Sequence, residues 1–311
     1  MLTTTIDKEI YIDFCKSSPN KDPFDYVKDD EDWLQLWKFL KSGTDLIVVS
    51  NEKYNGQNAE DRFITRLASG RGESKIRFIP KFNLPHKSTF PKDTFPGSYF
   101  MLDINNEVTQ KDLLSKNGFL FGFKNNYKET WDQLSISGNK FYAFQIRREH
   151  EGERSLKKWD DLSPYILPFT DVIISDRYIN DQTIRDQNLL KFLQIIDNKT
   201  TSSYNLLIVT QKGGKKFLDE FENYLTDKIK ELKLKAKLGI VLTSKEHDRC
   251  ILMNYLKIES GDSFNYFSKG DHIITNGTEL KLFPLCDKDN FEDAKVKLSA
   301  LKAIVENEQD D

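Results

Sequence analysis

Short runs of apolar residues are the feature of this sequence that most restricts its fold. Four of them occupy residues 45–50, 171–175, 205–210 and 238–243. Runs this short that are apolar almost throughout are typical of parallel strands buried on both faces. Between the last two runs, residues 217–232 carry apolar side chains at spacings of three and four, which predicts an amphipathic helix. Strands that alternate with helices predict an α/β fold.

The same patterns predict the remaining elements. Alternating or apolar stretches predict further strands at 9–14, 75–79, 99–103, 118–123, 141–146, 250–258, 272–275 and 281–284. Helical spacing predicts helices at 33–40, 59–68, 189–196 and 296–304, and Asp29 and Asp30 offer an N-cap to the first of these. Trp33 and Trp37 share one helical face, so we expect both in the core. The proline-rich segment 82–97 is expected to be a loop.

A charged stretch at 147–154 interrupts the hydrophobic pattern and predicts a domain boundary. We therefore expect an N-terminal α/β domain of unknown role over 1–150, a second α/β domain over 160–305 and a frayed acidic tail over 306–311.

Composition limits the classes of function. The net charge of −3 excludes a globally basic protein, so any nucleic-acid contact needs a local basic surface. The candidate, which is alternatively a solvated helix face, contains Lys212, Lys215, Lys216, Lys228, Lys230, Lys233, Lys235 and Lys237. Cys15, Cys250 and Cys286 lie too far apart in sequence for a metal knuckle, and we expect buried, reduced thiols. We expect no membrane span and no secretory signal, hence a cytoplasmic protein, and the Lys-, Asn-, Ile- and Phe-rich composition suggests a bacterial one.

One short motif carries chemistry. His247, Arg249, Asn254 and Gly261 follow one another at the spacing H-x-K-x4-D-x6-G. This is similar to the motif with which phospholipase D enzymes break phosphodiesters. The resemblance implies that His247 attacks phosphorus, that Arg249 holds a phosphate oxygen and that Asn254 with Ser260 orients them. Arginine keeps the charge of the usual lysine, whereas Asn254 removes a negative charge that would make a supported histidine more basic.

A second resemblance covers residues 162–304. The segments 174–179 and 187–189, followed by 247–249 and 260–267, are similar to the phospholipase D-like C-terminal domain of MIT-domain-containing proteins. Two departures stand out: Arg177 replaces the family's proline, and Gly261-Asp262-Ser263 replaces its Gly-Arg-Gly. The resemblance implies a phospholipase D-like fold for the second domain.

These observations lead to two hypotheses. In the first, the chain is a phosphodiester-engaging protein, a phage-defence nuclease or nucleic-acid-binding component, with a possible protein partner from the same operon. Catalysis would need no metal or cofactor, but a single motif requires a second histidine from a twofold homodimer. In the second, the fold is a non-catalytic scaffold that binds a protein or an anionic ligand. His247 and Arg249 would then be an ordinary hydrogen-bonded pair at a strand edge.

Two further sets of residues are candidates. Lys212, Gly213, Gly214 and Lys215 join a strand to a helix and offer backbone N–H groups and ammonium groups to a phosphate, although an ordinary βα turn has the same composition. Asp13, Asp45, Asp103 and Asp176 lie at or beside predicted strand ends, where carboxylates could bind Mg²⁺ as in PIN-type nucleases; the alternative is turn and cap residues.

Overall fold

The computed structural model describes residues 1–18, 31–50, 59–72, 74–79, 98–116, 119–148, 154–180, 185–200, 202–211, 215–243 and 248–309. The chain forms two compact units. Unit 1 comprises Met1–Asn139 with Leu285–Phe291, and unit 2 comprises Lys140–Pro284 with Glu292–Asp311. Both contain a sheet and helices, so the α/β prediction is confirmed.

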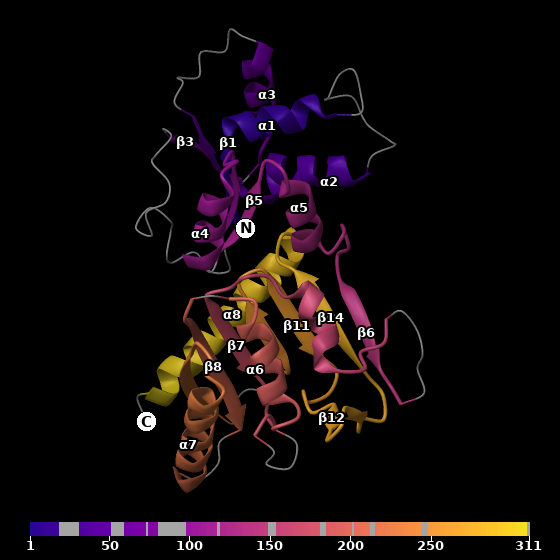
Figure 1. Cartoon of the computed structure of the whole chain (residues 1–311), viewed down its shortest axis with the longest axis vertical. Coiled ribbons are helices and arrows are strands. Elements are labelled where there is room, and N and C mark those ends of the chain that lie inside the picture. Colours follow the sequence, from indigo (N-terminus) through magenta and orange to yellow (C-terminus); the bar gives the residue numbers. More distant parts are fainter. Residues whose placement is uncertain are drawn as a thin grey trace. The chain divides into compact units, whose positions relative to one another are not determined.

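Unit 1 is built on a parallel sheet in the order β3-β2-β1-β4-β5 (Figure 1). Its strands are β1 (Thr3–Asp7), β2 (Asp45–Val49), β3 (Ile76–Ile79), β4 (Ser98–Leu102) and β5 (Leu120–Phe123). Its helices are α1 (Lys8–Lys16), α2 (Glu31–Lys38) with a following π-helical turn (Phe39–Gly43), α3 (Ala59–Ala68), α4 (Glu107–Lys116) and α5 (Tyr127–Ser135). The strand order reverses between β1 and β4, which is the position where open α/β sheets commonly bind ligands.

The first predicted strand, 9–14, is wrong. These residues lie in helix α1, and the strand is the preceding β-branched segment Thr3–Asp7. Ile10, Tyr11, Ile12 and Phe14 are all buried, so this helix is covered on most sides and lacks the single apolar stripe that marks a surface helix. Trp33 is 5% exposed and stacks on Phe14 with ring centroids 4.8 Å apart, so it belongs to the core as predicted, whereas Trp37 is only half-buried.

Unit 2 contains a mixed seven-stranded sheet in the order β6-β14-β11-β10-β7-β8-β9. Its main strands are β6 (Tyr142–Ile146), β7 (Asp171–Ser175), β8 (Tyr204–Gln211), β9 (Ala236–Thr243), β10 (Cys250–Met253), β11 (Leu256–Ser260) and β14 (Thr278–Pro284). Numbered within the unit, the order is 1-7-6-5-2-3-4. Strands β7, β8 and β9 are parallel, whereas β10, β11, β14 and β6 continue the sheet by antiparallel pairing.

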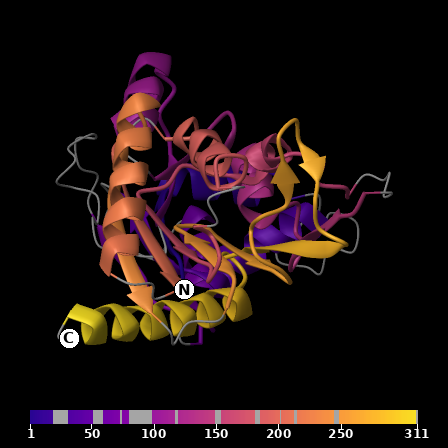
Figure 2. The same cartoon turned by 90° about the horizontal axis from the view of Figure 1, so that it is seen from below.

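Helices cover both faces of this sheet. They are a 3₁₀ helix (Trp159–Tyr165), α6 (Leu189–Asp197), α7 (Lys215–Glu231) and α8 (Lys288–Gln309), and the small hairpin β12 (Phe267–Ser268) and β13 (His272–Ile273) follows β11. Figure 2 shows α6 and α7 on one face and α8 along the other. Phe221, Leu225 and Ile229 of α7 are buried, as the apolar spacing of 217–232 predicts.

Unit 2 differs from expectation in three places. The predicted strand 250–258 is two antiparallel strands, β10 and β11, joined by a turn at Asn254 and Tyr255. Strand β6 pairs with β14, so unit 2 begins at Lys140, before the charged stretch, rather than after residue 150. Helix α8 continues to Gln309 and includes most of the predicted acidic tail. Val296, which was predicted to lie on the apolar face of this helix, is 69% exposed.

All three cysteines are free, as expected; Cys15 and Cys250 are buried, and Cys286 is half-buried. Across the described helices, none is both long enough and apolar enough to traverse a lipid bilayer.

Candidate functional site

The candidate site lies at the edge of the unit 2 sheet where the parallel strands β7, β8 and β9 end. Strand β10 runs antiparallel to β7, with Cys250 opposite Ser175, so it starts at this edge. Strand β11 runs antiparallel to β10 and returns to the same edge at Ser260. Side chains that follow β7, precede β10 and end β11 therefore converge there. The carboxyl ends of parallel strands are the usual location of ligand sites in α/β sheets.

Asp176, directly after β7, is the buried centre of this edge. Its side chain is fully buried, and its carboxylate accepts hydrogen bonds from the amide of Tyr178 (2.9 Å), the hydroxyl of Ser263 (2.6 Å) and the amide of Phe264 (2.7 Å). Burial raises the pKa of Asp176 above that of an ordinary aspartate. The three hydrogen bonds and the positive charge of Arg249 act in the opposite direction.

Arg249 precedes β10 and supplies the positive charge of the site. Its carbonyl accepts the amide of Ser260 (3.1 Å), which fixes its backbone to the end of β11. Its Nε is buried, and none of the side chains or carbonyls in the described segments accepts a hydrogen bond from it. A buried N–H donor without an acceptor is costly, about 1–3 kcal/mol. An anion that reached Arg249 would remove that cost.

Ser260 belongs to the same group. Its hydroxyl oxygen accepts hydrogen bonds from the hydroxyl of the buried Tyr266 and from the amide of Asp262 (3.1 Å). Burial raises the pKa of Tyr266, and the Ser260 hydrogen bond and the Arg249 charge lower it. The backbone hydrogen bond from Ser260 to Arg249 places these two residues at one edge of the sheet.

Asn254 does not belong to this group, so its predicted role in orienting the motif is corrected. It occupies the turn between β10 and β11, at the opposite edge of the sheet. Its side-chain oxygen accepts the amides of Thr170 (2.8 Å) and Asp171 (3.1 Å), which hold the start of β7. At about 3.3 Å per residue, the strand separates it from Arg249 by about 16 Å. The charge of an aspartate at position 254 would therefore lie far from Arg249, and the asparagine found there does not change the charge around Arg249.

The remaining predicted site residues can be located only in part. His247 and the segment Lys212, Gly213 and Gly214 lie outside the described residues. Strand β8 ends at Gln211 and helix α7 begins at Lys215, as the predicted strand-to-helix connection requires, but the Lys215 side chain is not described. Of the basic stretch, Lys228 pairs with Glu231 (2.7 Å) and Lys235 pairs with Asp197 (2.5 Å), which weakens it as a binding surface.

Sequence reasoning missed the central role of Asn188. This fully buried residue precedes α6, and its side-chain oxygen accepts the indole N–H of Trp159 (3.1 Å) and the amides of Tyr266 (2.9 Å) and Phe267 (3.0 Å). Its own amide donates to the Phe267 carbonyl (2.9 Å). A buried asparagine with four hydrogen bonds is a structural anchor. Its signals in the sequence were its place in segment 187–189 of the family resemblance and its position directly before an apolar run, and neither specified this role.

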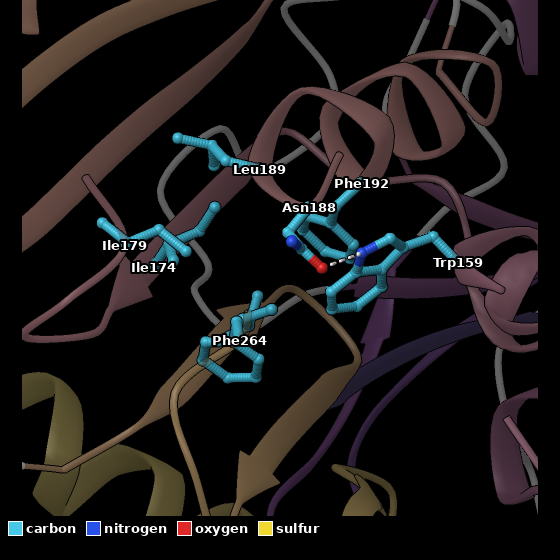
Figure 3. A pocket seen from close by; sticks show the side chains of 8 residues that line it. Trp159, Ile174, Ile179, Asn188, Leu189, Phe192 and Phe264 are labelled. Carbon is cyan, nitrogen blue, oxygen red and sulfur yellow. Dashed lines mark hydrogen bonds between the residues drawn. The ribbon is translucent and has the colours of Figure 1, made fainter. Parts of the chain in front are cut away.

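Asn188 also borders a small apolar cavity. Trp159, Ile174, Ile179, Asn188, Leu189, Phe192, Ile251 and Phe264 line it (Figure 3). The cavity has a volume of about 10 Å³, which holds about one water molecule, so it is a packing defect beneath the edge rather than a ligand pocket.

The four aspartates proposed for Mg²⁺ are not together. Asp13 lies in α1, Asp45 begins β2 and accepts the amide of Lys75 (2.8 Å), and Asp176 belongs to unit 2. Asp13 and Asp103 share Lys124, whose ammonium nitrogen is 2.8 and 3.9 Å from their oxygens. Within the described ranges, no three His, Cys, Asp or Glu side chains are grouped to hold a metal ion.

Comparison with known proteins adds no assignment: no family model matches this chain, and no curated protein matches it.

Proposed function

We propose that unit 2 is a phospholipase D-like domain that binds the phosphate groups of a nucleic-acid backbone through Arg249, with His247 two residues away. The observation that carries the proposal is the buried Nε of Arg249, which has no acceptor within the described part of the chain and lies at the carboxyl edge of the parallel strands. A guanidinium whose Nε–H lacks an acceptor can donate it to a phosphate oxygen, and its charge complements that of the phosphate. The connected segments 176–178, 249 and 260–266 are those that carry the family resemblance, which also supports the proposal.

The proposed chemistry is metal-independent. The His247 imidazole would form a bond to phosphorus while the leaving oxygen takes a proton from a second histidine, and water would then break the N–P bond. Arg249 would hold a non-bridging oxygen, and Ser260 would help to fix its position. The second histidine would come from another copy of the chain in a twofold dimer. A bacterial defence protein, acting with a partner encoded beside it, is the setting that we propose.

A non-catalytic scaffold remains the second candidate, and one observation favours it. Arg249 lies near the buried carboxylate of Asp176, so part of its charge already compensates that group. An arginine in this position can serve the fold alone, and the domain would then bind a protein or an anionic ligand by another surface.

The test combines binding and cleavage of labelled oligonucleotides, with and without EDTA. We expect Arg249→Ala to weaken binding about ten- to hundredfold, because a charge-assisted hydrogen bond contributes about 1.5–3 kcal/mol, and Arg249→Lys to retain most of the affinity. The matched control is Lys199→Ala. Lys199 lies between the end of α6 and the start of β8, and hence near the opposite edge of the sheet, and its loss should change little.

The outcomes separate the candidates. Equal binding by wild type and Arg249→Ala, or an equal loss in Lys199→Ala, contradicts the proposal. Binding that depends on Arg249 without any cleavage supports a non-catalytic domain. If EDTA abolishes cleavage and His247→Ala does not change it, the activity belongs to a metal site elsewhere in the chain.

A further inference from the structure

Tyr178 presents an exposed aromatic ring at the same edge as Arg249. Its side chain is 46% exposed, one of few large hydrophobic side chains in the described ranges that are so open. The next residue, Ile179, is 2% exposed and lines the small cavity with Ile174 and Phe264 (Figure 3). The turn after β7 thus anchors itself inward through Ile179 and leaves the tyrosine ring in solvent.

Hydrogen bonds from both sides of the site fix the backbone of Tyr178. The Tyr178 amide donates to Asp176 (2.9 Å), and the Asn265 side chain donates to the Tyr178 carbonyl (3.1 Å). The guanidinium carbon of Arg177 lies 5.5 Å from the ring centroid, while its Nε donates to Gln211 at the end of β8 (3.1 Å). The backbone of Tyr178 is therefore fixed to the end of β7 and to the loop after β11. The side chain of the preceding Arg177 is fixed to the end of β8. An exposed aromatic side chain on a rigid base loses little entropy when it binds a flat ligand.

We propose that Tyr178 stacks on a nucleobase of single-stranded nucleic acid whose backbone phosphate is held at Arg249. This inference rests on the proposed function and specifies its ligand. Asp176 links the two groups, because its carboxylate accepts the Tyr178 amide and because Asp176 and Arg249 both adjoin the paired residues Ser175 and Cys250 of β7 and β10. Single-stranded binding sites combine a basic group for the backbone with an aromatic ring for a base. In a duplex the base faces are already stacked, and a phospholipid head group offers a phosphate without a flat base.

The experiment compares four probes on the full chain: a single-stranded oligonucleotide, the same strand annealed to its complement, an abasic strand of equal length, and vesicles containing an anionic phospholipid. We expect the single strand to bind most tightly. Tyr178→Ala should weaken it about five- to hundredfold, because stacking on one base is lost, and should leave the weaker binding of the abasic strand unchanged. Tyr178→Trp should retain the affinity. Tyr178 is exposed, and its hydrogen bonds with Asp176 and Asn265 are made by its backbone, so these variants should fold.

Different experimental results would contradict this inference and the proposed function. If Tyr178→Ala binds all oligonucleotides like the wild type while Arg249→Ala does not, the stacking proposal is wrong and the phosphate site stands. If the duplex or the abasic strand binds as well as the single strand, base stacking does not contribute. If only the vesicles bind, the ligand is a lipid surface and both proposals on nucleic acid are wrong.

Discussion

The hydroxyl of Ser263 donates a 2.6 Å hydrogen bond to the carboxylate of Asp176, which lies 87 residues earlier in the chain. The amide of Phe264 donates to the same oxygen at 2.7 Å. These bonds hold the loop after β11 against the end of β7. Arg249 directly precedes Cys250, which lies opposite Ser175 of β7, and the carbonyl of Arg249 accepts the amide of Ser260. The candidate site therefore depends on a buried polar group that joins distant parts of unit 2.

Ser263→Ala should destabilise unit 2 by about 2 kcal/mol, because a hydrogen bond to a buried carboxylate is lost and one lone pair is left without a donor. Urea unfolding followed by circular dichroism measures the change. Ser299→Ala is the matched control: that exposed hydroxyl donates to the Lys295 carbonyl within α8. Its removal should change the free energy of unfolding by less than about 0.5 kcal/mol. Equal effects of the two variants would contradict the anchoring role of Ser263.

The pH dependence of stability should report the buried Asp176 carboxyl. Because burial raises its folded-state pKa above the ordinary value of 3.8, the folded state binds this proton more tightly than the unfolded state does. The contribution of Asp176 to stability is therefore fully present below the ordinary pKa and declines as pH rises through the raised one. Asp176→Asn removes the titration.

Urea unfolding of both proteins at several pH values tests this sign. The wild type should lose free energy of unfolding relative to Asp176→Asn as pH rises above about 4, and the difference should level off once the raised pKa is passed. All other titrating groups are common to the two proteins and cancel. A difference that grows in favour of the wild type with rising pH would mean that hydrogen bonds and Arg249 outweigh burial.

Much of the fold could be predicted from the sequence because most strands are short apolar runs. Strands β2, β7, β8 and β9 coincide closely with predicted segments. The hairpin at Asn254 could not be separated from one long strand, because both of its strands are buried and the whole stretch is apolar. Helix α1 was mistaken for a strand because it is buried on most sides, and burial removes the periodicity on which the prediction depends.

The site could be predicted less well, because motif spacing does not specify which edge of a sheet each residue occupies. Arg249 and Ser260 lie on one edge only because β10 and β11 reverse direction between them. That same reversal moves Asn254 to the other edge. Tyr178 could not be singled out from sequence, since its exposure depends on the inward packing of Ile179.

Asn254→Ala should reduce stability without affecting ligand binding at Arg249. The substitution leaves the amides of Thr170 and Asp171 without their acceptor in a nearly buried turn, at a cost of about 2–3 kcal/mol. Because the turn lies about 16 Å from Arg249, oligonucleotide affinity below the unfolding transition should equal that of the wild type. Fluorescence anisotropy and urea unfolding measure the two quantities. A loss of affinity as large as that of Arg249→Ala would mean that Asn254 contributes to the binding site.

Asn188→Asp should make the stability of unit 2 strongly dependent on pH. The substitution places a carboxyl group in an apolar environment where three donors and the Phe267 carbonyl surround it. When protonated, the carboxyl can still donate to that carbonyl. When ionised, it cannot, and its charge is buried beside Trp159 and Phe192. Burial and the facing Phe267 carbonyl raise the pKa of the new carboxyl more than the three N–H donors lower it, so we expect the variant to lose stability as pH rises above the ordinary aspartate value. Urea unfolding at about pH 5 and about pH 8 measures the loss, with the exposed Asn276→Asp as control. If both variants show the same small pH dependence, Asn188 does not anchor the loop that carries Ser263 and Tyr266.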